Sequence, residues 1–185
     1  MKNNTKHIIF KNFIKYLYKK KIKYCVLTIG KNFPLQIIRD IDFYINFSNK
    51  SELINLVNIF CNKNSLKIIN IFQHEVNSYF FCLSFVNLKN NIEFVQFDIC
   101  NNYIINGQKI IKFDSEDIFT NKKYKNYQYS VLKKDVEIAY ILIKKINKLQ
   151  LDEYQFKYIF KNKKIKEINI LKKYFYPSTY KKIIK

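Results

Sequence analysis

A two-residue alternation in the stretch "DIDFYINF", residues 40–47, most strongly constrains the fold of this chain. Every second position is apolar, at Ile41, Phe43, Ile45 and Phe47. The positions between them begin with two acids, Asp40 and Asp42. Side chains alternate between the two faces of a strand, so the pattern predicts a half-buried strand with both carboxylates on one face. Like charges this close repel each other unless a positive charge lies between them.

A third carboxylate ends another predicted strand. In "IEFVQFDI", residues 92–99, Asp98 shares a face with Gln96 and Phe94. Two acids on one strand and a third at the end of a second strand are suited to hold two divalent cations, with one carboxylate bridging them. Hard oxygen ligands favour Mg²⁺, which commonly arrives with substrate phosphates. Asp98 is placed to accept the proton of an acceptor hydroxyl.

The remaining periodicity predicts an α+β fold, with a mixed sheet and flanking helices. Helical spacing covers residues 8–21 and 48–64, and strand patterns cover 23–30, 66–72 and 78–86. The turn composition of "NLKNN" predicts an antiparallel hairpin between 78–86 and 92–99.

Beyond this core of residues 1–115, we expect a connection and a C-terminal helical portion over 116–185. Ser115 offers a helix cap, and "KKYKNYQYSVL", residues 122–132, has the composition of a polar, tyrosine-rich connection. The clearest helical pattern spans 135–148, and weaker ones span 152–163 and 165–175.

The charge of the chain points to a polyanionic partner. It carries 34 basic residues against 14 acidic ones, a formal net charge of +20. All the basic residues but Arg39 are lysines, which disfavours a sequence-specific DNA reader because such proteins depend on arginine. A codon bias toward lysine accounts for much of this charge, and the lysines fit either a solvated coat or an RNA surface.

The cysteines and histidines give no metal-binding spacing. Four cysteines lie far apart without a CxxC pair, and the chain has only two histidines, so no zinc site is predicted. We assign His74, Cys25 and Cys100 to structure. No stretch is long and apolar enough to cross a bilayer, and the first residues lack the apolar segment of a signal peptide, so we expect a cytoplasmic protein.

The stretch "IGKNFPLQIIRDIDFYI" followed by "VQFDI" resembles the nucleotidyltransferase superfamily of the polymerase-beta type. The resemblance implies that Asp40, Asp42 and Asp98 are the metal-binding and catalytic triad for two Mg²⁺ ions, with an NTP as substrate. Gly30 matches the glycine of the phosphate-binding turn. Lys31 stands where the superfamily has a small residue, so it either contacts the triphosphate or marks a site that no longer transfers.

Longer segments are similar to nucleotidyltransferase-like proteins of bacterial surface-polysaccharide gene clusters. These are "YCVLTIGKNFP", "RDIDFYI", "VQFDICNNYIINGQKII" and "EIAYILIKKINK". This similarity implies transfer of a nucleoside monophosphate to a small-molecule acceptor in glycan metabolism. Two alternatives stay open at this point: a non-catalytic module that binds a nucleotide or a protein, and transfer to an RNA end.

Overall fold

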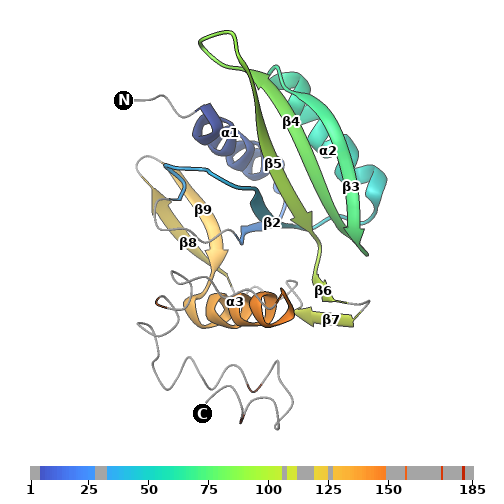
Figure 1. Ribbon diagram of the computed structural model, residues 1–185, viewed down its shortest axis with the longest axis vertical. Coiled ribbons are helices and arrows are strands. Elements are labelled where there is room, and N and C mark those ends of the chain that lie inside the picture. Colours follow the sequence, from blue (N-terminus) through green and yellow to red (C-terminus); the bar gives the residue numbers. More distant parts are fainter. Residues whose placement is uncertain are drawn as a thin grey trace. The chain divides into compact units, whose positions relative to one another are not determined.

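The computed structural model describes residues 5–27, 33–105, 108–111, 119–124 and 127–148, and the single positions 157, 172 and 181. Seven strands form a mixed sheet in the order β3-β4-β5-β2-β1-β9-β8, and β6 pairs with β7 in a second, two-stranded sheet (Figure 1). The helices are α1 (Thr5–Lys19), α2 (Lys50–Lys63) and α3 (Lys134–Lys148). The α+β class and the mixed sheet with flanking helices are therefore confirmed.

The strands agree with most of the predicted ranges. Their bounds are β1 Tyr24–Val26, β2 Ile41–Ile45, β3 Lys67–Glu75, β4 Ser78–Val86, β5 Ile92–Cys100, β6 Tyr103–Ile105, β7 Gln108–Ile111, β8 Phe119–Tyr124 and β9 Tyr127–Leu132. The expected hairpin is present, because β4 and β5 pair antiparallel along their whole length.

The chain divides into two compact units. One comprises Met1–Glu116 with Asn121–Val131, and the other comprises Asp117–Thr120 with Leu132–Lys185. The first unit contains α1, α2 and strands β1 to β7, and the second contains α3. In α3, Asp135 and Glu137 lie in the first turn, where negative charge is favourable to the helix dipole.

Both faces of the β2–β5 pair follow from the alternation in the sequence. The two strands run parallel, with Ile41 opposite Phe97 and Phe43 opposite Ile99. These four side chains are fully buried. Asp42 lies between Ile41 and Phe43 and therefore points to the other face of the sheet. One face of the β2–β5 pair therefore packs in the core, and the other face carries the carboxylates.

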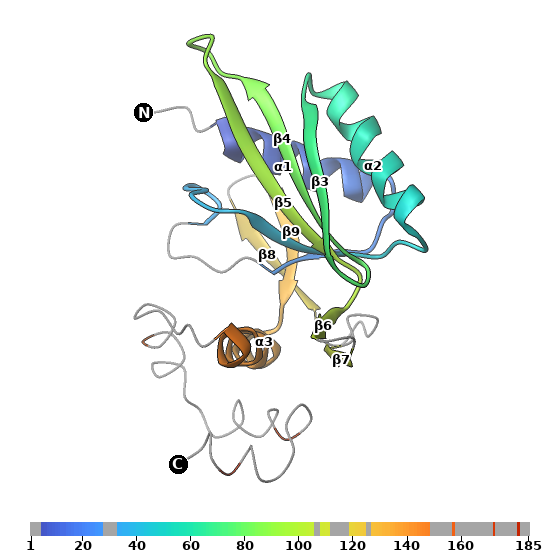
Figure 2. The same cartoon turned by 45° about the vertical axis from the view of Figure 1, so that its right-hand side comes forward.

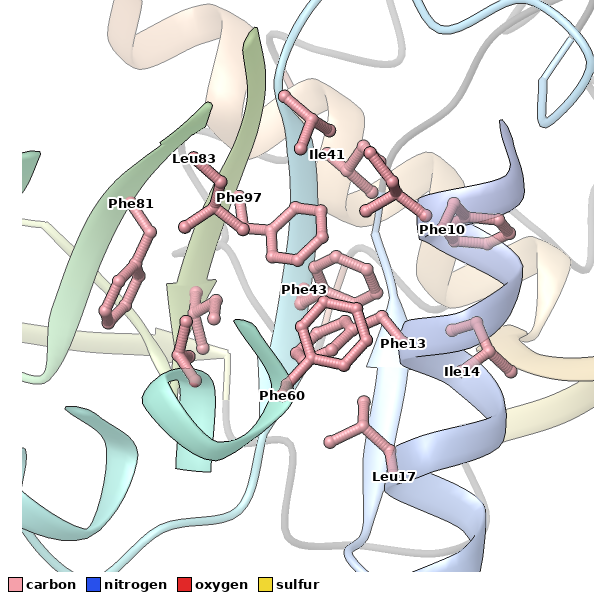
Figure 3. Close-up of a cluster of buried hydrophobic side chains, with 14 of the residues drawn as sticks. Phe10, Phe13, Ile14, Leu17, Ile41, Phe43, Phe60, Phe81, Leu83 and Phe97 are labelled. Atoms are coloured by element: carbon pink, nitrogen blue, oxygen red, sulfur yellow. The ribbon is translucent and has the colours of Figure 1, made fainter. Parts of the chain in front are cut away.

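Phe13 of α1 is at the centre of the core that covers the apolar face. Its ring lies 4.7 Å from that of Phe97 on β5, 5.3 Å from Phe43 on β2 and 4.8 Å from Phe60 on α2, measured between centroids (Figure 3). One side chain therefore contacts two strands and the second helix. Figure 2 shows α1 and α2 against the same side of the strands.

The start of α2 is fixed by a reciprocal cap. The Asn49 side chain accepts a hydrogen bond from the Glu52 backbone N–H at 2.9 Å, and the Glu52 carboxylate accepts one from the Ser48 N–H at 2.6 Å. This arrangement satisfies two backbone donors that a helix start would otherwise leave exposed. The cap therefore sets the residue at which α2 begins.

One sequence interpretation was wrong. Residues 122–132, expected as a polar connection, contribute to strands β8 and β9 of the main sheet. Tyr127 and Tyr129 are buried at alternating positions of β9. Aromatic side chains have high strand propensity and fit a half-buried pleated surface, so the tyrosines favour a strand despite their polar neighbours. The Ser115 cap lies outside the described residues, and so do the helices expected over 152–163 and 165–175 apart from the single positions 157 and 172.

Truncation of the central ring tests this core. Phe13→Ala removes a fully buried side chain and leaves a cavity among three aromatic rings. We expect a loss of about 3–5 kcal/mol in the free energy of unfolding, measured by urea denaturation. Tyr18→Ala, on the same helix but 78% exposed, is the control and should change stability by less than about 0.5 kcal/mol. Equal losses in both variants would contradict this packing.

Candidate metal site

The three predicted carboxylates come together on the face of the sheet opposite the core. One oxygen from each of Asp40, Asp42 and Asp98 lies within 4.8 Å of the other two. Asp40 directly precedes β2, Asp42 is within β2, and Asp98 lies near the end of β5. All three side chains are partly exposed. The convergence predicted from the alternation pattern is confirmed.

Strand register creates this cluster. Asp42 is the direct partner of Asp98 in the parallel pairing of β2 with β5. On its other side, β2 is held by β1, where the Leu27 N–H donates to the Asp42 carbonyl at 2.8 Å. Beyond the pair, the Asn101 side chain donates to the Phe47 carbonyl at 2.6 Å, which ties the chain after β5 to the chain after β2. The carboxylates therefore project from a backbone fixed on both sides.

The donor set fits a hard divalent cation. Two oxygens that share one Mg²⁺ at about 2.1 Å lie at most about 4.2 Å apart. The three oxygens lie within 4.8 Å of one another, so at most a small side-chain movement would bring all three to one ion. A pair of ions about 3.5–4 Å apart accommodates the observed spread as well. Carboxylate oxygens alone, without thiolate or imidazole, favour Mg²⁺ over zinc.

His74 is a neighbour of this cluster that sequence reasoning missed. Its Nε2 atom lies 2.8 Å from Oδ1 of Asp98, so the side chain assigned to structure from the sequence instead contacts the candidate site. His74 is on the edge strand β3, with β4 between it and β5. Phe72 pairs with Phe80 and Phe80 with Asp98, so strand alternation puts His74, two residues after Phe72, on the same face of the sheet as Asp98. The sequence does not encode that β3 pairs with β4 and β4 with β5, so it could mark His74 only as one of two histidines.

Gly30 and Lys31 lie outside the described residues, and the structure describes the chain again from Phe33. The Phe33 ring packs 5.0 Å from that of Phe10 and 6.3 Å from that of Tyr129. The next carbonyl, of Pro34, accepts a hydrogen bond from Nδ1 of His7 at 2.8 Å. The segment that leads into Asp40 is thereby attached to α1 and β9.

The cysteines are not among the three residues of the candidate metal cluster. Cys25 and Cys61 are buried, and Cys82 and Cys100 are partly exposed. Burial raises the pKa of Cys61 to about 11, so its thiol is neutral and unreactive near pH 7. In the ranges that the structure describes, no second group of three His, Cys, Asp or Glu residues is suited to a metal. None of the helices in those ranges has the length and apolar content needed to span a bilayer.

Comparisons with known proteins add little to this geometry. No protein-family profile matches the sequence, and no curated protein matches it. Among solved structures, the chain is similar to a crystal structure described as a "putative nucleotidyltransferase" from H. pylori, at 11% identity and a TM-score of 0.45. The match covers 75% of this chain and 57% of that chain, so this protein spans little more than half of the other's length. The function therefore has to be inferred from the residues of the site.

Metal binding should be visible in the stability of the fold. Consider a cation that binds the folded protein but not the unfolded chain. At a concentration ten times its dissociation constant, it raises the free energy of unfolding by about 1.4 kcal/mol, which corresponds to a rise of about 3–6 °C in the melting midpoint. We expect this rise with millimolar Mg²⁺ in thermal melts of the parent. Asp42→Asn should fold but lose the response, because one ligand charge is gone.

The matched control is Glu93→Gln, which removes a charge at the opposite end of β5. It should keep the full Mg²⁺ response. An identical rise in the parent and in Asp42→Asn would mean that Mg²⁺ acts elsewhere on the protein.

Proposed function

We propose that this chain is a Mg²⁺-dependent nucleotidyltransferase, which moves a nucleoside monophosphate from an NTP to a hydroxyl or phosphate group of a small-molecule acceptor. The register that sets Asp42 beside Asp98, with Asp40 in reach of both, carries the proposal. Like charges directly opposite each other on neighbouring strands are destabilising. Divalent cations would neutralise the three carboxylates and so stabilise a fold that places them together. Such cations also bind triphosphates.

The proposed reaction is an in-line displacement at the α-phosphorus of the NTP. An acceptor oxygen forms the new bond to phosphorus while the bond from phosphorus to the oxygen bridging the α and β positions breaks. Pyrophosphate leaves with that electron pair. Asp98 accepts the proton of an acceptor hydroxyl, and Asp40, Asp42 and Asp98 together would hold the cations. When bound, Mg²⁺ supplies charge neutralisation at the triphosphate and activation of the acceptor hydroxyl.

The triphosphate also needs contacts from the protein. We assign these to Gly30 and Lys31, on the resemblance of "IGKNF" to the phosphate-binding turn of the polymerase-beta superfamily. Glycine permits positive φ and close approach of the backbone to phosphate. Lys31 replaces the usual small residue and offers a positive charge in its place.

The acceptor we propose is a small polar molecule of glycan metabolism, such as a sugar or sugar phosphate. This assignment rests on the similarity to proteins of surface-polysaccharide clusters. The cytoplasm is the proposed compartment, since it supplies NTP and Mg²⁺ and keeps thiols reduced. All the proposed site residues fall within residues 1–115, which we propose as the nucleotidyltransferase core, with 116–185 as its C-terminal portion.

Label transfer from NTPs tests the reaction. The parent is mixed with each of the four common NTPs, labelled at the α-phosphate, together with Mg²⁺ and a polar small-molecule extract. We expect label on a small acceptor and release of pyrophosphate. Asp98→Asn should lower the rate about 10²- to 10⁴-fold, as loss of a general base does, while NTP binding measured by calorimetry changes less.

Two further variants sharpen the assignment. Glu93→Gln should transfer at the parental rate, and Lys31→Ser should weaken NTP binding if Lys31 contacts the triphosphate. Tighter binding by Lys31→Ser would instead show that the lysine obstructs the turn. Binding of NTP without pyrophosphate release would indicate a non-catalytic module, and label on added RNA would indicate an RNA end as acceptor. A parent that binds no NTP in Mg²⁺ would refute nucleotidyl transfer.

A further inference from the structure

A hydrogen bond between His74 and Asp98 links the candidate metal site to the edge strand of the sheet. The Nε2 to Oδ1 distance is 2.8 Å, which is typical of a charge-assisted hydrogen bond. A carboxylate without a proton can only accept, so a hydrogen bond to it requires the His74 tautomer with a proton on Nε2. The side chains are 36% and 23% exposed, so solvent does not fully compete with the contact.

Two features of β3 direct the His74 side chain toward Asp98. Phe72 pairs with Phe80, and Phe80 pairs with Asp98, so alternation along β3 puts Phe72 and His74 on the face of the sheet that carries Asp98. The register of β3 against β4 shifts between Gln73 and Glu75, and irregularities of this kind often lie next to active sites. The ring of Phe72 lies 6.5 Å from that of His74 at an interplanar angle of 25°, so the two rings are stacked. The imidazole is thereby restricted before any ligand binds.

The bond determines which oxygen of Asp98 is available. A carboxylate can rotate about its Cβ–Cγ bond and present either oxygen to a cation. With Oδ1 held by His74, Oδ2 is the oxygen left for a metal ion or for the proton of an acceptor. Groups that hydrogen-bond metal ligands from outside the coordination sphere fix ligand orientation in this way.

We propose that His74 is a positioning residue for Asp98, which fixes the carboxylate so that one oxygen faces the cations bound with Asp40 and Asp42. This inference rests on the proposed metal site and adds a member to it. His74 itself contacts neither the substrate nor the metal in this account. Its effect is transmitted through the orientation of Asp98 and should appear in metal affinity even without turnover.

Direct titration with Mn²⁺, followed by the EPR signal of the free ion, tests the proposal on the full chain. His74→Phe keeps a planar ring but removes the donor, and we expect its Mn²⁺ affinity to fall about 10- to 100-fold. His74→Gln keeps an N–H donor at a similar reach and should stay within about threefold of the parent. If the His74 ring had only a structural role, glutamine would not restore the Mn²⁺ affinity.

Gln73→Ala is the control for disturbance of the edge strand. Its side chain hydrogen-bonds only the nearby Glu75 carbonyl in the described contacts and is expected to leave Mn²⁺ affinity unchanged. If His74→Phe fails to fold by circular dichroism, His74→Ala, which adds no apolar surface at this exposed position, replaces it with the same expected loss.

The outcomes separate this proposal from the one on which it rests. A parent that binds Mn²⁺, with His74→Phe weakened and His74→Gln near parental, supports the positioning role. Parental affinity in His74→Phe, or an equal loss in the phenylalanine and glutamine variants, overturns the role of His74 while the metal site stands. A parent that binds no Mn²⁺ overturns both the metal site and this inference.

Discussion

The parallel pairing of β2 with β5 is the constraint on which the rest of the candidate site depends. It sets Asp42 directly beside Asp98, and the same register sets Ile41 beside Phe97 on the opposite face. The apolar face is held by Phe13, which reaches both strands from α1. Burial of these rings therefore fixes the register, and the register fixes the carboxylates. A shift by one residue would reverse both faces at once.

This coupling explains how the fold can keep three like charges together. The repulsion is confined to three carboxylates, and it is opposed by a core in which Phe13, Phe43 and Phe97 are fully buried. The strands cannot separate to relieve the repulsion without exposing Phe43 and Phe97. The sheet therefore holds a local cluster of negative charge in a chain whose net charge is +20. The cluster favours the binding of cations, and the positive charge of the rest of the chain favours the anions that accompany them.

The sequence predicted the parts of this site that depend on local patterns. The alternation in residues 40–47 predicted the strand, its buried face and the shared face of Asp40 and Asp42, and the position of Asp98 at a strand end predicted its convergence with them. His74 could not be predicted in this way. Its contact depends on the order β3-β4-β5 and on the register of these strands, which no local pattern encodes.

The interpretation of residues 122–132 failed for a related reason. Lysine, asparagine and tyrosine gave that stretch the composition of a connection, yet Tyr127 and Tyr129 are buried strand residues. In a chain that is rich in lysine throughout, polar composition is a weak sign of a loop, and the alternation of the aromatic residues is the better guide.

The most direct test of the central claim is a crystal structure of the protein grown with Mn²⁺ and a non-hydrolysable NTP analogue. Anomalous scattering locates Mn²⁺ without reference to any assumed site. Our account predicts anomalous peaks within bonding distance of Asp40, Asp42 and Asp98, with the triphosphate bound to the same ions. Mn²⁺ and the analogue bound away from these three carboxylates, or absent from them at saturating concentration, would contradict it.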